Sequence, residues 1–340
     1  MTLFATAKVF LEWGVAGVCR AVARRAWALA VVAPLVAVPV TMQRQLAMPA
    51  HEAPAPASGA VEEPITPLPP PPSADALVVS LGELLFRDTR LSRDNTLSCA
   101  SCHDLATNGA GGKSRDIGLD GQVLVLNTPT VFNAALVFRF NWEGQFRSLE
   151  DQIVASLENP QIMGTTLEAA AGRLNTDPAM INRFKAAFGQ RPDRASIVQA
   201  LATFQRSLTT PGSRFDRWLR GDSDALTAQE LRGYALFKSL GCISCHHGIN
   251  VGANLFARHG IFHPLASPMP ERLRVPGLRN VEATAPYFHD GSAPTLQDAV
   301  RRMARSQLNS TLTDEQVEGI VAFLRTLTGE FEGQPVRGPL

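Results

Sequence analysis

The sequence predicts an all-α fold of two tandem domains, preceded by an N-terminal leader and a proline-rich linker. Three observations support this prediction. Helical apolar patterns recur without any long alternating strand pattern, one cysteine motif occurs twice, and the first seventy residues differ in composition from the rest. The length of 340 residues suits two domains, because single hydrophobic cores stop growing beyond roughly 250–300 residues.

The overall composition is that of a folded globular protein, with 45% hydrophobic and 19% charged residues. Thirty-two basic residues against 31 acidic ones leave a formal net charge of +1. Proteins that bind nucleic acid by neutralising phosphates normally have a basic excess, so we expect no nucleic-acid partner. Five cysteines are too few for a disulfide scaffold of this length.

The N-terminal leader is predicted over residues 1–48. Its uncharged apolar run Trp27–Val40 follows Arg24 and Arg25, as in a secretory signal or an N-terminal anchor. The run is short for a membrane span, which needs roughly twenty residues. We therefore expect export to the periplasm, with either cleavage or a tether to the inner membrane. Residues 49–72 are rich in proline and predict an extended linker that cannot pack a core.

The repeated motif is C-x-x-C-H, which is typical of covalent c-type haem attachment. It occurs as Cys99-Ala-Ser-Cys102-His103 and as Cys242-Ile-Ser-Cys245-His246. Two thiols three positions apart can reach the two vinyl groups of one porphyrin, and the next residue supplies an imidazole as the proximal iron ligand. A thioredoxin-like pair would not need the histidine twice, and a four-cysteine zinc site would join widely separated pairs. The motifs thus predict two covalently bound haem c groups.

Helix signals surround both motifs. The stretch Asp75–Phe86 has a helical apolar pattern ahead of the first motif, Ser148 begins a second helix, and Ala195–Leu208 repeats one apolar face. Capping boxes at Thr227–Glu230 and Thr313–Gln316 begin two further helices. Each domain thus pairs a first helix, a haem motif and a closing helix. We place the domains at residues 73–211 and 212–329, followed by a tail over residues 330–340.

Longer stretches around these motifs resemble a known family. They are LFRDTRLSRDNTLSCASCHDL, NTPTVFNA, GCISCHHG and VPGLRNVEATAPYFHDGSAPTLQDAV followed by Met303. Their order resembles that of the bacterial di-haem cytochrome c peroxidases, which include the MauG proteins, from about Leu84 to Gly329. The resemblance implies two cytochrome c-like domains. It also implies a low-potential, peroxide-reacting first haem and a high-potential second haem that stores an electron.

The resemblance also implies roles for individual residues. His103 would be the axial ligand of the first haem, and His246 and Met303 those of the second. Trp142 matches a tryptophan between the haems, and His289 resembles a propionate partner of the second haem. A calcium ion is implied at positions matching Asn127, Thr284 and Pro286.

The expected peroxide pocket of the first haem departs from the family. Leu119 stands where many members have a distal histidine, and Ile162 occupies the position of the distal glutamate. Gln152 matches a retained distal glutamine, which can orient peroxide but cannot accept its proton. Peroxide cleavage benefits from a group that moves a proton, and such help is typically worth about 10²–10⁴-fold in rate. Isoleucine cannot supply it.

Three functions therefore stay open. The first is a peroxidase that reduces hydrogen peroxide to water with electrons from a small cytochrome c or a cupredoxin. The second is a non-catalytic electron carrier or redox sensor, which Leu119 and Ile162 favour. The third is a MauG-like oxidase, against which Met303 argues because MauG has a tyrosine ligand there. A homodimer is left open as the assembly.

Overall fold

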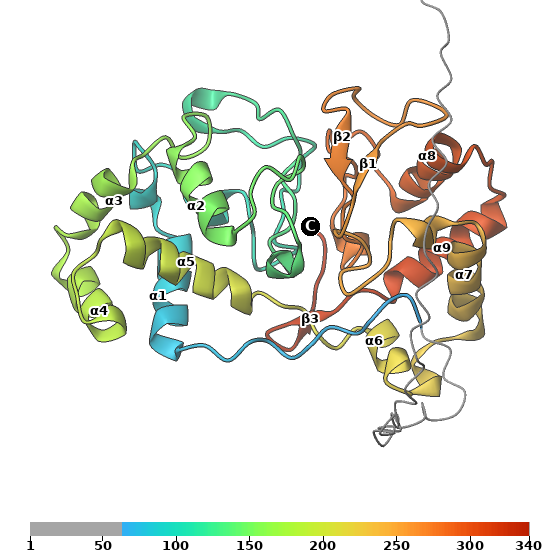
Figure 1. Ribbon diagram of the computed structural model, residues 1–340, viewed down its shortest axis with the longest axis horizontal. Coiled ribbons are helices and arrows are strands. Elements are labelled where there is room, and N and C mark those ends of the chain that lie inside the picture. Colours follow the sequence, from blue (N-terminus) through green and yellow to red (C-terminus); the bar gives the residue numbers. More distant parts are fainter. Residues whose placement is uncertain (1–62, 340) are drawn as a thin grey trace, which may run out of the picture. The chain divides into compact units, whose positions relative to one another are not determined.

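The computed structural model describes residues 63–339. Within this range the protein is helix-rich and contains two short antiparallel ribbons of two strands each (Figure 1). The α-helices are α1 Ala76–Phe86, α2 Leu149–Glu158, α3 Leu167–Leu174, α4 Pro178–Phe188, α5 Arg194–Ser207, α6 Arg214–Leu219, α7 Ala228–Ser239, α8 Leu296–Leu308 and α9 Asp314–Arg325. The strands are β1 Phe256–Arg258, β2 Arg272–Arg274, β3 Glu330–Phe331 and β4 Gln334–Pro335.

The ribbons correct the all-α expectation in detail. β1 pairs with β2 with Phe256 opposite Arg274, and β3 pairs with β4 with Glu330 opposite Pro335. Strands of two or three residues are too short for a period-two pattern to be seen in a sequence. Seven single 3-10 turns complete the regular structure of the described range, at Thr89–Leu91, Cys99–Ser101, Leu119–Gly121, Ala134–Leu136, Ser223–Ala225, Cys242–Ser244 and Val281–Ala283.

The helices begin where their capping residues predict. Asp75 accepts a hydrogen bond from the backbone N–H of Leu77, and Ser148 accepts one from Asp151. Complete capping boxes are formed by Thr227 with Glu230 and by Thr313 with Gln316. Each cap satisfies backbone donors that the first helical turn leaves unpaired. The predicted helix starts are confirmed.

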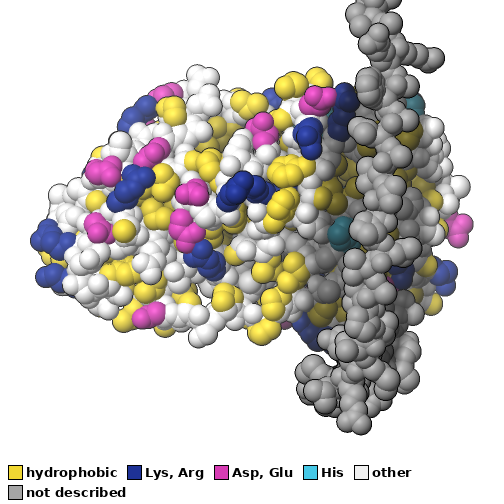
Figure 2. Space-filling view, viewed as in Figure 1, with side chains coloured by type: hydrophobic (Ala, Val, Ile, Leu, Met, Phe, Trp, Pro, Cys, Tyr) yellow, Lys and Arg dark blue, Asp and Glu magenta, His cyan; other side chains and the backbone are white. Residues whose placement is uncertain are grey.

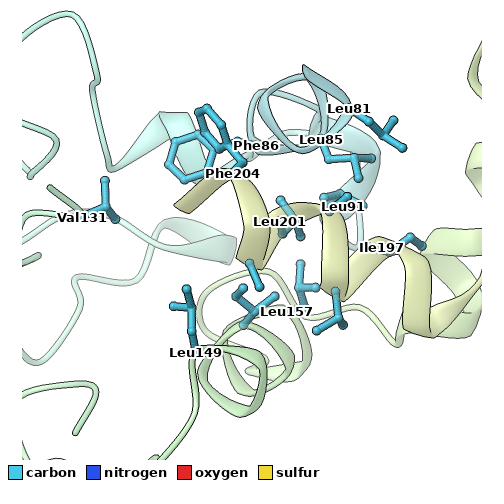
Figure 3. Packing of buried hydrophobic residues seen from close by; sticks show 14 of the residues in the cluster. Leu81, Leu85, Phe86, Leu91, Val131, Leu149, Leu157, Ile197, Leu201 and Phe204 are labelled. Atoms are coloured by element: carbon cyan, nitrogen blue, oxygen red, sulfur yellow. The ribbon is translucent and has the colours of Figure 1, made fainter. Parts of the chain in front are cut away.

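The first domain is built on the crossing of α1 and α5. A Cβ atom on Gly82 of α1 would overlap with the carbonyl oxygen of Ala200 in α5, so only glycine allows the two helices to lie this close. Figure 3 shows the apolar side chains that pack around this crossing, with Leu85 and Phe86 from α1, Leu157 from α2 and Leu201 from α5. These side chains are almost completely buried.

The second domain repeats this arrangement with α7 and α9. A Cβ atom on Gly233 of α7 would overlap with the carbonyl oxygen of Gly319 in α9. Phe237 and Phe323 pack beside the crossing with their ring centroids 5.1 Å apart. In each domain the first helix of the crossing leads into a haem motif, as the sequence predicted.

The N-terminal segment, residues 63–68, belongs to the second domain although it precedes the first. Ile65 and Leu68 are 1% exposed, and Ile65 lies in the core of the second domain. The carbonyl of Pro64 accepts a hydrogen bond from the N–H of Gly248 at 2.8 Å. The described end of the predicted linker therefore packs into a core, contrary to expectation, because the side chain of Ile65 finds apolar partners far away in sequence.

The C-terminal hairpin, residues 330–336, follows the second domain in the chain but packs against the first. Val336 is buried in the core of the first domain, and the ring of Phe331 lies 4.8 Å from that of Phe132. The residues expected to be a free tail therefore complete the first domain. In Figure 1 the segment leading to α1 and the β3 strand run beside each other between the two domains.

The predicted leader and the first part of the linker, residues 1–62, lie outside the described residues. Among residues 63–339, no helix has the length and apolar character needed to cross a bilayer. Acidic and basic side chains are interspersed over the face shown in Figure 2, in keeping with the net charge of +1.

Candidate functional site

The first haem motif folds as a 3-10 turn over Cys99–Ser101. Ser98 and Ser101 form a capping box at its start, and the N–H groups of Cys102 and His103 both donate to the carbonyl of Cys99. Both cysteines are free of disulfide bonds. Burial raises the pKa of Cys99 to about 12 and that of Cys102 to about 11, so both are neutral thiols at neutral pH. The motif thus presents two thiols and one imidazole from a single turn.

His103 is oriented by a backbone carbonyl. Its Nδ1 lies 3.1 Å from the oxygen of Gly109, which can only accept a hydrogen bond. Nδ1 therefore holds the proton, and the lone pair of Nε2 is left for a metal. Gly109 has a φ of +64°, which glycine adopts without strain. Burial lowers the pKa of His103, which keeps the imidazole neutral as iron ligation requires.

The second motif has the same turn at Cys242–Ser244. Gly241 begins it with a φ of +92°, and the N–H of His246 donates to the carbonyl of Cys242 at 3.0 Å. Burial lowers the pKa of His246 to about 4. A Cβ atom on Gly252 would contact both His246 Nδ1 and the carbonyl oxygen of Pro276. Glycine at position 252 therefore lets this carbonyl approach the imidazole.

The donor sets of both motifs fit haem c. Each offers two unpaired thiols for thioether bonds and a buried, neutral imidazole as axial ligand. An aromatic ring supports each imidazole at 6.4 Å between ring centroids, Phe86 beside His103 and Phe237 beside His246. Each imidazole is therefore held from one side by an aromatic ring of the helix that leads into its motif.

Met303 lies on α8 and is half-buried. The preceding residue, Arg302, fixes this helix by donating to the carbonyls of Ser292 and Leu265 and by lying over the ring of Phe288. The end of α8 also reaches the second motif, since a Cβ atom on Gly241 would touch Leu308. The structure thus places the helix of Met303 beside the second motif.

Trp142 lies where the two domains meet. Its indole Nε1 donates to the carbonyl of Asn127 at 2.8 Å, and its ring meets that of His289 edge to face at 6.2 Å. The N–H of Asn127 donates to the carbonyl of His289 at 2.7 Å, and the N–H of Arg274 donates to the carbonyl of Trp142. One network therefore joins three residues that the sequence singled out, from both domains.

Arg274 belongs to none of the motifs that mark functional residues in the sequence. This residue is 9% exposed, burial lowers its pKa to about 10, and no carboxylate among residues 63–339 forms an ion pair with it. Its guanidinium makes one long hydrogen bond, 3.4 Å from Nε to the carbonyl of Asn141. No periodic pattern marks a single buried arginine, so only the tertiary structure reveals it.

The predicted peroxide pocket combines two loops. The N–H of Leu119 donates to the carbonyl of Gln161 at 3.0 Å, so the loop of Leu119 packs on the loop of Ile162. Leu119 is buried, and Ile162 is half-buried against the core of the first domain. Gln152 lies on α2, where its amide donates to Ser156 at 2.8 Å. The two positions expected to hold a distal histidine and a distal glutamate are therefore both occupied by apolar side chains.

The three predicted calcium ligands lie on segments that meet through His289. The side-chain nitrogen of Asn127 donates to the carbonyls of Lys113 and Ser114, which leaves its oxygen for another partner. The hydroxyl of Thr284 donates to the carbonyl of Val281. Among residues 63–339 no group of three His, Cys, Asp or Glu side chains could hold a metal. A calcium ion here would rely on amide and carbonyl oxygens.

His289 is almost fully buried, and its polar contacts are with protein. Its Nε2 lies 3.0 Å from the carbonyl oxygen of Ser267, and its ring lies 4.8 Å from that of His259. His259 in turn contacts the carbonyl of Pro270. Both imidazoles therefore hold the loop between β1 and β2.

Comparison with known proteins agrees with this geometry. A family model described as di-haem cytochrome c peroxidase matches residues 77–224, and one described as cytochrome c matches residues 231–328. Cytochrome c551 peroxidase of Nitrosomonas europaea is 40% identical over 288 residues, which cover 80% of this chain and 86% of that protein. The methylamine utilization protein MauG of Methylorubrum extorquens is 33% identical over 288 residues, covering 77% and 82%.

A solved structure of a MauG-like protein associated with microbial copper homeostasis is also similar. It is 28% identical with a TM-score of 0.67, covering 77% of this chain and 94% of that one. The two family models coincide with the two helix crossings and confirm two cytochrome c-like domains in tandem. The chain belongs to the family of di-haem cytochrome c peroxidases and MauG proteins and is a peroxidase-type oxidoreductase that binds haem c.

Proposed function

We propose that the protein reduces hydrogen peroxide to water with electrons from a small cytochrome c or a cupredoxin. The observation that supports this most directly is the network of Trp142, Asn127 and His289, which joins the domains of the two haem motifs. A protein with two isolated haems would not need such a junction. Reduction of one peroxide to two waters consumes two electrons and two protons, and two linked haems can supply both electrons.

The residues divide this work between the domains. The first haem, attached at Cys99 and Cys102 with His103 as ligand, would supply the iron chemistry that cleaves peroxide. In the second domain His246 and Met303 would stabilise a reduced iron that stores one electron. Trp142 shortens the path between the two sites with an aromatic ring that contacts both domains. Leu119 and Ile162 are apolar and can neither donate nor accept a proton there.

Arg274 is a better partner for a haem carboxylate than His289. A guanidinium buried without a carboxylate is costly, and a propionate would compensate its charge. His289 already uses Nε2 on Ser267. Replacing Arg274 by Gln should lower the reduction potential of one haem, while Arg272→Gln, which removes an exposed charge from the same strand, should not. Unchanged potentials in Arg274→Gln would remove this assignment.

The peroxidase proposal is tested by mixing the half-reduced protein with peroxide in a stopped-flow spectrometer. We expect the second haem to be oxidised as peroxide is consumed, and turnover to continue when a reduced cytochrome c is added. Trp142→Ala should slow oxidation of the second haem, whereas the exposed Phe262→Ala should not.

The strongest alternative is an electron carrier or redox sensor. The apolar residues Leu119 and Ile162 favour it, because they leave the predicted pocket without an ionisable group. This function would be established if the half-reduced protein ignored peroxide while still exchanging electrons with a cytochrome. Oxidation of an organic or protein substrate by peroxide would instead indicate a MauG-like oxidase.

We further propose a calcium ion held by Asn127, Thr284 and Pro286, and a periplasmic location with a tether through the leader. The free side-chain oxygen of Asn127 supports the first. If calcium is present, chelation should weaken the junction and slow electron transfer between the haems, and added calcium should restore it. For the location, the test is cell fractionation: haem-loaded protein found chiefly in the cytoplasmic fraction would contradict a periplasmic location.

A further inference from the structure

Asp116 is a buried carboxylate without a partner. It lies in the loop after the first haem motif and is 9% exposed, and its Oδ2 atom is fully buried with no hydrogen bond. None of the ion pairs among residues 63–339 includes it. Buried carboxylates are normally paired or hydrogen-bonded, because desolvating a charge is expensive. Such an exception calls for an explanation.

The carboxylate packs on the turn that orients His103. A Cβ atom on Gly111 would overlap with Asp116 Oδ2, and Gly109, two residues earlier, supplies the carbonyl that accepts from His103 Nδ1. The backbone holds Asp116 in this place. Its carbonyl accepts from the N–H of Leu124 at 2.9 Å, and Ile117 and Val123 form a β-bridge beside it. The backbone that carries the side chain is therefore fixed on both sides of Asp116.

The carboxylate of Asp116 lies beside the turn that follows the first haem motif and orients His103. Lys113 is exposed and does not pair with Asp116. No cationic side chain among residues 63–339 therefore forms an ion pair with this carboxylate.

We propose that the negative charge of Asp116 lowers the reduction potential of the first haem, because it stabilises the more positive, oxidised state of that haem. Charges in a poorly hydrated interior interact more strongly than charges in water, so one fixed carboxylate is effective there. The inference deepens the proposed function and rests on haem attachment at Cys99 and Cys102, but not on peroxide turnover. A protein that ignored peroxide would leave it intact.

The test is a spectroelectrochemical titration of the holoprotein that resolves the two haems. Asp116→Asn and Asp116→Ser remove the charge, Asp116→Glu keeps it, and Asp120→Asn removes an exposed charge of the same loop that pairs with Arg93. We expect both neutral variants to raise the midpoint potential of the first haem and to leave the second unchanged. Asp116→Glu and Asp120→Asn should leave both potentials near those of the parent.

Several outcomes would overturn the proposal. An unchanged or lowered potential of the first haem in both neutral variants would show that Asp116 has no net charge beside the haem. Equal shifts of both haems would indicate a general loosening of the structure. Failure of both neutral variants to bind two haems would assign Asp116 a structural role. Slower peroxide turnover at unchanged potentials would make it a proton carrier instead.

Discussion

Ile162 lies on the loop after α2, half-buried against the core of the first domain, with its backbone neighbour Gln161 bonded to Leu119. A glutamate here would place an ionisable group at the contact of the two loops. Isoleucine instead places an apolar side chain against the core of the first domain. Core packing and proton transfer thus make opposite demands on this position.

Replacing Ile162 by Glu should raise the peroxidase rate by one or more orders of magnitude, since general acid–base help is typically worth about 10²–10⁴-fold. The measurement is steady-state turnover with peroxide and a reduced cytochrome. The glutamine of Ile162→Gln has nearly the same shape as glutamate but cannot carry a proton, so the turnover rate of this variant should stay near that of the parent. Equal rates in all three proteins, with fast turnover in the parent, would mean that another group moves the proton.

At the scale of single residues, the sequence predicts the haem motifs but not the buried charged side chains. The four cysteines and two histidines were identifiable because covalent haem attachment requires them at fixed spacing. Arg274 and Asp116 were not, because a buried charge is recognised by what surrounds it. Their surroundings come from the loops around Asn141 and Gly111, which no local pattern connects to them.

Among the elements, α7 begins with a cap that also forms an ion pair. The carboxylate of Glu230 accepts from the N–H of Thr227 at 2.8 Å and pairs with Arg214. Burial acts to raise the pKa of Glu230, but the bonds from Arg214 and Thr227 outweigh it and hold the pKa below its ordinary value. The start of α7 therefore depends on an ionised carboxylate.

Glu230→Gln should lower the free energy of unfolding by about 1 kcal/mol at pH 7. Because the folded-state pKa is depressed, the stabilisation is present above the ordinary carboxyl pKa of about 4.3 and is lost as the pH falls through the lower, folded value. The difference from the parent should thus shrink in acid, as measured by denaturant titration. Glu315→Gln, in the exposed first turn of α9, is the control. A difference that stays constant down to acid pH would contradict this account.

Stability should also be sensitive to substitution of Gly82, the glycine at the crossing of α1 and α5. Gly82→Ala places a methyl group against the Ala200 carbonyl and should cost about 1–3 kcal/mol of stability, as overpacking does. Gly172→Ala in α3 meets no neighbouring atom and should instead stabilise by about 0.5–1 kcal/mol. Unfolding midpoints in denaturant compare the two. Equal effects would show that the crossing is not tightly packed.

For the whole molecule, the sequence predicted two domains in the right order, but residues 63–68 and 330–336 pack into cores that it did not predict for them. Residues 63–68 lie in a proline-rich stretch and residues 330–336 form a short hairpin, and neither segment has a helical pattern that would predict a core position. Ile65 precedes the first domain in the chain but completes the core of the second domain. Val336 follows the second domain but completes the core of the first. Contacts of this kind are decided by apolar complementarity between distant segments, which local patterns do not encode.

Ile65→Ala should therefore destabilise the second domain, by the roughly 2–5 kcal/mol typical of such truncations in a core. The absorption of the second haem should report the loss first during unfolding, although Ile65 lies next to the first domain in sequence. Ile261→Ala, at an exposed site, should have little effect. If Ile65→Ala perturbed the first haem alone, the N-terminal segment would not belong to the second domain in solution.

The crossed ends also impose an order on synthesis. The segment around Ile65 emerges from the ribosome early but must wait for α7 and α9 before it can pack, and the first domain waits for Val336. The core of the second domain is therefore incomplete until α9 has been made, and the core of the first until residues 330–336 have been made. Residues 330–336 would then act as a closing step, after which the first domain reaches its final packing.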